Sequence, residues 1–232
     1  DIFVLPELSP IGYSDDTFAK WLPTNAHKQD MYKEIDQAMR EIATNLGVYI
    51  CYGTVGWDDE QTSAAQYGPK MSIRQVVVDR SGQQVACYDK TFLCDYGVCT
   101  ETRFFQSGPA SRPVSFVVKT LDESSSFRFG LLICSDMRYP GLARQLVADQ
   151  EHRVDCILQP AAFARDCSFR TWSSFRETRA VENSVYWVGV NYAGNEYGET
   201  SIVPPWIDED NEPKVLGCED SYLIGSVSRA TL

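Results

Sequence analysis

The sequence is poor in histidine, the side chain that most often activates a cysteine or serine nucleophile in enzymes. Only His27 and His152 occur among the 232 residues. His27 lies in a polar stretch before a predicted helix, and His152 lies in a loop that leads into a predicted strand. Neither position suits a base for a nucleophile at the carboxyl end of a strand. A Cys–His protease or transferase is therefore disfavoured.

Long apolar runs are also missing from the sequence. No run approaches the roughly 18 apolar residues that a membrane-spanning helix needs, and no signal peptide is visible. Positive charge is scarce as well, since the formal net charge is -11. This charge disfavours nucleic acids and anionic membrane surfaces as partners. We therefore expect a protein that binds neither nucleic acid nor membrane.

The motifs of several other enzyme classes are absent. The eight cysteines include no CxxC pair, which excludes the spacing of zinc knuckles and ribbons. There is no Gly-x-Ser-x-Gly elbow, no P-loop and no Gly-x-Gly-x-x-Gly. The scattered cysteines do not form the pattern of a disulfide framework, and several lie in apolar runs, where a thiol acts as a small hydrophobic group. We expect a reducing compartment and a cytoplasmic location.

What is present indicates a globular α/β protein. The hydrophobic content of 44% in 232 residues predicts a single packed domain over residues 1–232. Apolar spacing predicts helices over residues 29–46, from Pro140 onward, and over 169–183. Residues 57–70 are polar and loop-like. Predicted strands cover residues 1–8, 48–52, 72–79, 84–88, 114–119, 127–134, 154–159, 185–191, 201–203 and 222–228. Strands that alternate with helices, together with a hairpin, predict a mixed layered architecture.

One cysteine stands out by its position. An apolar run that starts at Phe129 ends at Cys134, and a helix is predicted to begin at Pro140 shortly after it. In α/β folds the carboxyl ends of strands present side chains to ligands. We therefore interpret Cys134 as a nucleophile.

Two charged residues occupy equivalent places. Glu7 and Lys90 each follow a predicted strand, so all three side chains converge if their strands are neighbours with the same orientation. An ammonium group would favour the Cys134 thiolate and stabilise an oxyanion, and a glutamate would serve as general base and then acid. The alternatives are a solvated strand end for Glu7 and an ordinary surface lysine for Lys90.

Five stretches carry a family resemblance. Three of them surround the candidate residues, and two lie further along the chain: VLPEL at residues 4–8, YDKT at 88–91, LICSDMRYP at 132–140, ILQPAAF at 157–163 and RAVEN at 179–183. Together and in this order they resemble the nitrilase (carbon–nitrogen hydrolase) superfamily over essentially the whole chain. The residues after Cys134 are more similar to those of amidases and carbamoylases than to nitrile-cleaving members, which typically carry Trp-Glu there.

The resemblance implies an α/β fold, a four-layer α-β-β-α sandwich. Family members usually begin with one more strand and helix, so we expect a sandwich that lacks these two elements. The resemblance assigns Cys134 as nucleophile, Glu7 as general base and Lys90 as oxyanion stabiliser, with the backbone N–H of Ser135 completing the oxyanion hole. It implies no metal and no organic cofactor. It also implies a homodimer, for which the helices at Pro140 and Trp172 are the candidates.

Four further residues are candidates by resemblance or position. Glu101 resembles a second glutamate that orients the lysine and the substrate; the alternative is a loop carboxylate paired with Arg103. Arg138 is a candidate for holding a substrate carboxylate, with a structural ion pair as the alternative. Phe163 and Trp172 are candidates for lining the pocket, with a place in the core as the alternative.

The predicted function is hydrolysis of a linear, non-peptide amide through a thioester on Cys134. An N-carbamoyl compound is the alternative substrate class. Two other classes stay open. The chain could be a binding protein that keeps the fold without catalysis, or an acyltransferase in which an amine rather than water resolves the thioester.

Overall fold

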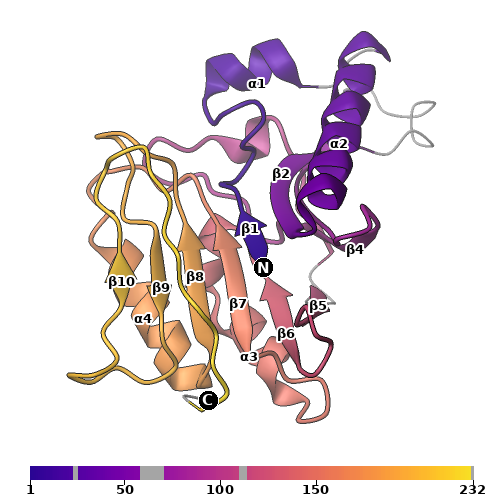
Figure 1. The fold of residues 1–232 in the computed structure, drawn as a ribbon. Coiled ribbons are helices and arrows are strands. Elements are labelled where there is room, and N and C mark those ends of the chain that lie inside the picture. Colours follow the sequence, from indigo (N-terminus) through magenta and orange to yellow (C-terminus); the bar gives the residue numbers. More distant parts are fainter. Residues whose placement is uncertain (23–25, 58–70, 110–113, 231–232) are drawn as a thin grey trace. The chain divides into compact units, whose positions relative to one another are not determined.

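The computed structural model describes residues 1–22, 26–57, 71–109 and 114–230 (Figure 1). The chain divides into two compact units, Asp1–Ser111 and Arg112–Leu232, and each is described by itself. The loop predicted at residues 57–70 lies outside the described residues from position 58 on.

The first unit contains a four-stranded sheet in the order β1-β2-β3-β4. Its strands are β1 (Ile2–Val4), β2 (Tyr49–Trp57), β3 (Met71–Val78) and β4 (Gln84–Asp89). β1 runs parallel to β2, and the other two pairs are antiparallel. The parallel pair requires a crossover, and this crossover contains α1 (Asp15–Trp21) and α2 (Ala26–Leu46).

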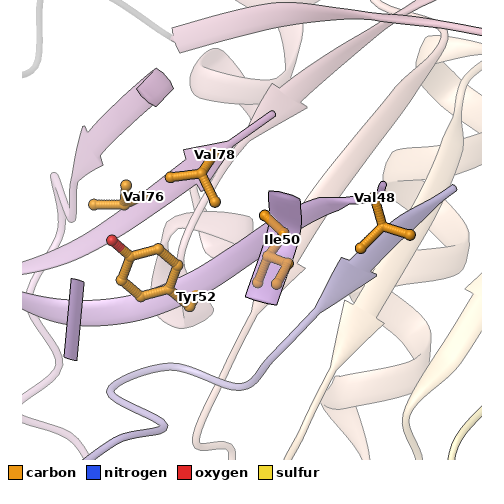
Figure 2. Packing of buried hydrophobic residues seen from close by; sticks show 6 residues of the cluster. Val48, Ile50, Tyr52, Val76 and Val78 are labelled. Atoms are coloured by element: carbon orange, nitrogen blue, oxygen red, sulfur yellow. The ribbon is translucent and has the colours of Figure 1, made fainter. Parts of the chain in front are cut away.

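The core of the first unit lies between α2 and the sheet. Alternate residues of β2 point to one face, and valines of β3 pack beside them (Figure 2). Met39 and Ala43 of α2 belong to the same cluster. The buried members of this cluster are Ala43, Val48, Ile50, Tyr52, Val76 and Val78. The helix predicted over residues 29–46 is confirmed, with a start three residues earlier, at Ala26.

α1 was not expected from apolar spacing, because this helix has seven residues and only one buried side chain, Phe18. Its start carries a local signal instead. The Ser14 side chain accepts a hydrogen bond from the Thr17 backbone N–H (3.1 Å), and Asp15 and Asp16 occupy the first turn. Serine at the cap followed by acidic residues stabilises a helix N-terminus.

The second unit contains a six-stranded sheet in the order β10-β9-β8-β7-β6-β5. Its strands are β5 (Val114–Lys119), β6 (Ser126–Leu131), β7 (Cys156–Pro160), β8 (Tyr186–Val190), β9 (Ser201–Val203) and β10 (Lys214–Val215). β6, β7 and β8 are parallel, and the outer pairs are antiparallel. The parallel connections contain α3 (Pro140–Ala148) and α4 (Thr171–Asn183), which pack against each other on one face of the sheet (Figure 1).

The strand predicted over residues 222–228 is wrong. These residues form no strand, and Tyr222 and Ile224 are exposed. The reason is the direction of this segment. A Cβ at Gly225 would meet the Ile202 side chain of β9, and Arg229 donates a hydrogen bond to the Ser126 carbonyl of β6. The segment therefore crosses the strands (Figure 1), so it cannot form a ladder with any one of them.

Two sheets with helices in the crossovers confirm the predicted α/β class. Within the described residues, no helix is long and apolar enough to cross a membrane.

Candidate active site

In the first unit, a buried ammonium group lies between two buried carboxylates. Lys90 Nζ donates hydrogen bonds to Glu7 Oε1 at 2.8 Å and to Glu101 Oε1 at 2.6 Å. All three side chains are 0% exposed. We call these three residues the charge cluster. The alternatives of a surface lysine and a solvated Glu7 are therefore excluded.

The backbone after β4 fixes Lys90. Its N–H donates to the Ile73 carbonyl, and its carbonyl accepts from the Gly108 N–H, each at 2.8 Å. A Cβ at Gly108 would lie 2.4 Å from the Asp89 carbonyl oxygen, so only glycine allows this approach. The Asp89 side chain in turn pairs with Arg74 at 2.7 Å. Lys90 is thus held by the sheet on its N-terminal side and by the Gly108 backbone on its C-terminal side.

Glu7 lies in the loop after β1, and β2 passes directly beside this loop. A Cβ at Gly53 would be 2.3 Å from the Leu8 backbone nitrogen. Leu8 has a φ of +49°, and its carbonyl accepts from the N–H groups of Ile11 and Gly12 at 3.0 Å. A tight turn against a glycine of β2 therefore sets the position of Glu7.

Glu101 begins the short 3-10 helix η2 (Glu101–Arg103). Its Oε1 accepts from the Tyr13 hydroxyl as well as from Lys90, and its Oε2 accepts from the Cys94 N–H at 2.7 Å. Arg103 pairs with Asp15 at 3.3 Å. The structure thus pairs Glu101 with Lys90, and the alternative of a Glu101–Arg103 pair is wrong.

In the second unit, Cys134 occupies a strained turn. It begins the 3-10 helix η3 (Cys134–Arg138), which we call the cysteine turn. Its φ of +44° lies in the left-handed region, which costs a residue other than glycine about 1–3 kcal/mol. The side chain is buried, with 5% exposed. Such strain persists only where neighbouring groups hold the backbone in place.

Gln159 of β7 holds the Cys134 backbone. Its amide nitrogen donates to the Cys134 carbonyl at 2.9 Å, and its amide oxygen accepts from Trp187 Nε1 at 2.9 Å. An indole N–H can only donate, so Trp187 fixes which end of the Gln159 amide faces Cys134. All three groups are buried.

Two further side chains hold the cysteine turn. Asp136 accepts from the Ile133 N–H at 3.1 Å, which caps the turn. Arg179 of α4 donates to the Met137 carbonyl at 3.0 Å and pairs with Glu182 at 2.8 Å. These contacts explain why the RAVEN stretch belongs to the pattern around the cysteine.

The remaining candidates of the second unit lie around the cysteine turn. Ser135 is its second residue and is buried. The half-buried Arg138 places its guanidinium over the rings of Phe163 (5.5 Å) and Phe175 (5.4 Å). Phe163 stacks on Trp172, whose indole N–H donates to a backbone carbonyl. Both aromatic side chains are buried, which agrees with the core alternative, and their contact with substrate stays a prediction.

Two of the other cysteines have thiols that burial makes harder to ionise. Cys51 and Cys156 are both 0% exposed. Burial raises the pKa of Cys51 to about 12 and raises that of Cys156 as well, where Asp155 adds to the effect.

Across the described ranges, no three His, Cys, Asp or Glu side chains form a group that could hold a metal ion.

Sequence reasoning missed two residues of these arrangements. Tyr13 contacts Glu101 but was not a candidate, and Gln159 holds Cys134 but entered only as part of the matched stretch at 157–163. A buried glutamine in the apolar strand 154–159 was the available signal, because a buried amide needs partners.

Comparison with known proteins agrees with this fold. An amidase mutant from Nesterenkonia sp. AN1, with an acetamide moiety added at its active-site cysteine, superposes with a TM-score of 0.72. The two chains are 23% identical, and the match covers 94% of this chain and 74% of that one. The protein therefore has the α/β fold of nitrilase-superfamily amidases. The model of the carbon–nitrogen hydrolase family matches residues 1–209, and the chain belongs to this family.

Two relatives with curated names are an amidase of deaminated glutathione and an omega-amidase. Deaminated glutathione amidase from Rattus norvegicus is 28% identical over 180 residues, which are 72% of this chain and 50% of that protein. Omega-amidase from Homo sapiens is 29% identical over 216 residues, 88% of this chain and 69% of that protein. The chain thus spans about half the length of the deaminated glutathione amidases that it matches.

Proposed function

We propose that this protein is an amidase that hydrolyses a small, linear, non-peptide amide through a thioester on Cys134. The observation that carries the proposal is the charge cluster, in which a fully buried ammonium is shared by two carboxylates. Burying three charges is costly, and structural ion pairs seldom need it. Family membership and the amidase names of the relatives support the same reaction.

In the first half of the proposed reaction, Cys134 Sγ attacks the amide carbon and Glu7 accepts the thiol proton. The carbonyl oxygen becomes an oxyanion, which Lys90 and the Ser135 N–H stabilise. The C–N bond then breaks while Glu7 gives its proton to the leaving ammonia or amine. The product of this half is an acyl thioester on Cys134.

In the second half, water attacks the thioester carbon and Glu7 takes one proton from the water. The oxyanion forms again at the same donors and collapses with cleavage of the C–S bond. The carboxylic acid leaves, and the proton on Glu7 returns to the sulfur. Atoms and protons balance without a metal or an organic cofactor.

Charge balance supports Glu7 as the proton carrier. The cluster holds two carboxylates and one ammonium, so it carries one excess negative charge when all three groups are ionised. Uptake of a proton by Glu7 would make the buried cluster neutral, which low polarity favours. Glu101 accepts from Lys90, Tyr13 and the Cys94 N–H, so we assign it the role of positioning Lys90.

The substrate class follows from the relatives and from Arg138. One relative is named as an amidase of deaminated glutathione and another as an omega-amidase. A half-buried guanidinium at the end of the cysteine turn would pair with a carboxylate on the substrate. The Phe163 ring would support Arg138 directly, and Trp172 stacks on Phe163 in turn.

The test is ammonia release from a panel of small amides, carbamoyl amino acids and nitriles. We expect turnover of carboxylate-bearing amides, and loss of turnover in Cys134→Ala with an unchanged circular dichroism spectrum. Turnover by Cys134→Ala would refute the assignment. Preference for carbamoyl compounds would favour the alternative substrate class.

Mass spectrometry separates the remaining alternatives. An acyl adduct on the peptide that contains Cys134 indicates catalytic competence, and no adduct with any amide favours a binding protein. Faster release of the acyl group by added amines than by water would indicate an acyltransferase.

We propose in addition that the protein is cytoplasmic and forms a homodimer. Within the described ranges, no cysteine is in a disulfide, which suits a reducing compartment. A shallow hollow on α4, lined by Glu177, Thr178, Val181 and Glu182, is where a helix from a second copy would pack. Analytical ultracentrifugation tests the dimer, and Val181→Asp should shift the protein to the monomer.

A further inference from the structure

Cys94 and Cys99 bracket a tight loop in the first unit. The Cys99 N–H donates to the Tyr96 carbonyl at 3.2 Å, and Gly97 supplies a φ of +65°. The Cys99 thiol hydrogen-bonds the sulfur of Cys94. Both cysteines are partly exposed, and residues 95–98 between them are exposed. The two sulfurs therefore face each other where a small oxidant can reach them.

The loop makes Cys94 unusually acidic. The hydrogen bond from Cys99 lowers the pKa of Cys94 to about 7, although partial burial raises it. The backbone of Tyr96 and the ammonium of Lys90 lower it further. Cys94 is thus substantially a thiolate at neutral pH, whereas burial raises the pKa of Cys51 to about 12.

The same loop holds one carboxylate of the charge cluster. The Cys94 N–H donates to Glu101 Oε2 at 2.7 Å, and the Glu101 N–H donates to the Cys94 carbonyl at 3.1 Å. Glu101 Oε1 in turn accepts from Lys90 at 2.6 Å. A shift of the Cys94 backbone would therefore move the Glu101 side chain, which is hydrogen-bonded to Lys90.

We propose that Cys94 and Cys99 form a reversible disulfide when peroxide is present, and that this disulfide lowers the activity by displacing Glu101. The first part concerns the thiols alone. The second part rests on the amidase function proposed above.

The chemistry balances with hydrogen peroxide as the two-electron oxidant. The Cys94 thiolate attacks one peroxide oxygen, the O–O bond breaks, and the hydroxide that leaves takes up a proton to become water. Cys94 is now a sulfenic acid. The Cys99 sulfur attacks the Cys94 sulfur, the S–O bond breaks and a second water leaves. A dithiol such as dithiothreitol reverses the reaction by thiol–disulfide exchange.

The bond changes the loop because its geometry is specific. Two sulfurs joined covalently lie about 2.05 Å apart with a dihedral angle near 90°. Two hydrogen-bonded sulfurs lie much farther apart than two sulfurs joined by a covalent bond. Residues 94 and 99 must therefore draw together, which turns the Cys94 peptide away from Glu101. Lys90 would lose part of the restraint that directs its ammonium.

Tryptic peptides give a direct readout of the bond. Trypsin cleaves after Lys90 and Arg103, so one peptide, residues 91–103, contains both cysteines. After peroxide treatment and thiol blocking, we expect this peptide to be lighter by two hydrogen atoms, and dithiothreitol should restore its mass. The same result in Cys134→Ala would show that Cys134 takes no part. A peptide 91–103 that stays reduced, or is joined to another peptide, would overturn the proposal.

Activity measurements test the coupling to Glu101. The peroxide dose is chosen so that the peptide of residues 129–138, which contains Cys134, keeps its reduced mass. At this dose we expect ammonia release to fall about tenfold or more and to recover with dithiothreitol, since small displacements of catalytic groups have effects of this size. Cys99→Ser should start at normal activity and resist the treatment. Cys167→Ser, which removes an exposed thiol outside the pair, should respond like the wild type.

The outcomes separate this proposal from the function it rests on. A disulfide in residues 91–103 that leaves ammonia release unchanged refutes the coupling and leaves the amidase function intact. A reduced protein that releases no ammonia from any amide refutes the amidase function. The mass shift of the peptide would still decide whether the disulfide forms.

Discussion

The two units hold their candidate catalytic residues in opposite ways. In the first unit, charged side chains hold one another, since Lys90 pairs with Glu7 and Glu101 and all three are buried. In the second unit, hydrogen bonds to backbone atoms hold a strained turn, and the carbonyl of Cys134 itself is held by the neutral side chains Gln159 and Trp187. Buried charges need oppositely charged partners to offset their desolvation cost, whereas a strained turn needs only a few well-placed hydrogen bonds.

This difference has a consequence for mutations. Removing one member of a buried ion cluster leaves its partners charged and buried. The free energy of unfolding therefore falls by more than the ion pair itself contributes. Removing a neutral hydrogen bond leaves a smaller desolvation cost. The same comparison predicts a larger loss of stability in the first unit than in the second for changes of similar size.

The largest effect is expected for Lys90→Met. Two buried carboxylates would lose their cation, so we expect unfolding free energy to fall by roughly 3–5 kcal/mol and ammonia release to be lost. Urea denaturation measures the first effect. Lys119→Met removes an exposed lysine 3.7 Å from Glu123 and should change stability by less than about 1 kcal/mol. Equal effects of the two substitutions would contradict the ionic account of the cluster.

A smaller effect is expected for Gly53→Ala. Its Cβ would lie 2.3 Å from the Leu8 nitrogen, so the loop that bears Glu7 must shift, at a cost of about 1–3 kcal/mol. We expect kcat to fall more than stability alone would explain. Gly141→Ala is the matched control, because its Cβ would meet nothing within 4 Å and alanine favours the helix of α3. Thermal melting and ammonia release distinguish the two.

Gln159→Leu tests whether the hydrogen bonds of Gln159 hold the Cys134 carbonyl in place. The Trp187 N–H and the Cys134 carbonyl would both lose a buried partner, which costs about 1–3 kcal/mol. We expect a reduced rate of Cys134 labelling by iodoacetamide, because the turn is no longer held in its strained form. Trp187→Phe removes only the group that orients the Gln159 amide, so the labelling rate should fall less than in Gln159→Leu. An unchanged labelling rate in Gln159→Leu would show that Gln159 does not hold Cys134 in its reactive position.

The smallest effect is expected for Asp79→Ala in the turn between β3 and β4. Partial burial raises the pKa of Asp79, but hydrogen bonds from Ser81 and Gln83 outweigh it and hold the pKa below its usual 3.8. The stabilisation is therefore present above about pH 4 and is lost as pH falls through the folded pKa. We expect a loss of at most about 1 kcal/mol at pH 7 and a smaller loss at pH 2. Urea denaturation at both pH values measures it.

Local pattern predicted much of the fold. Helices over residues 29–46 and 169–183 appear as α2 and α4, because apolar side chains at helical spacing need only one face to be buried. The strand over 222–228 failed although its residues favour strands. Strand formation requires a free sheet edge in the right direction, and residues 222–229 cross the sheet instead.

The candidate site was predictable in its residue types and less so in its contacts. Glu7, Lys90 and Cys134 followed from their places after apolar strands and from the matched stretches. Whether Glu101 pairs with Arg103 or with Lys90 was undecided. Only Thr102 separates Glu101 from Arg103 along the chain, so proximity in sequence favoured the wrong pair, and only the loop of residues 94–101 brings Glu101 to Lys90.

The sequence by itself determined the class of the protein, the order of most of its elements and the identity of the candidate nucleophile. These depend on residue type and spacing along the chain, which a sequence shows directly. Tertiary structure decided that Lys90 lies between two carboxylates, that Gln159 fixes Cys134, and that Cys94 is joined to Glu101. These contacts depend on three-dimensional proximity between distant residues, which composition and periodicity do not contain.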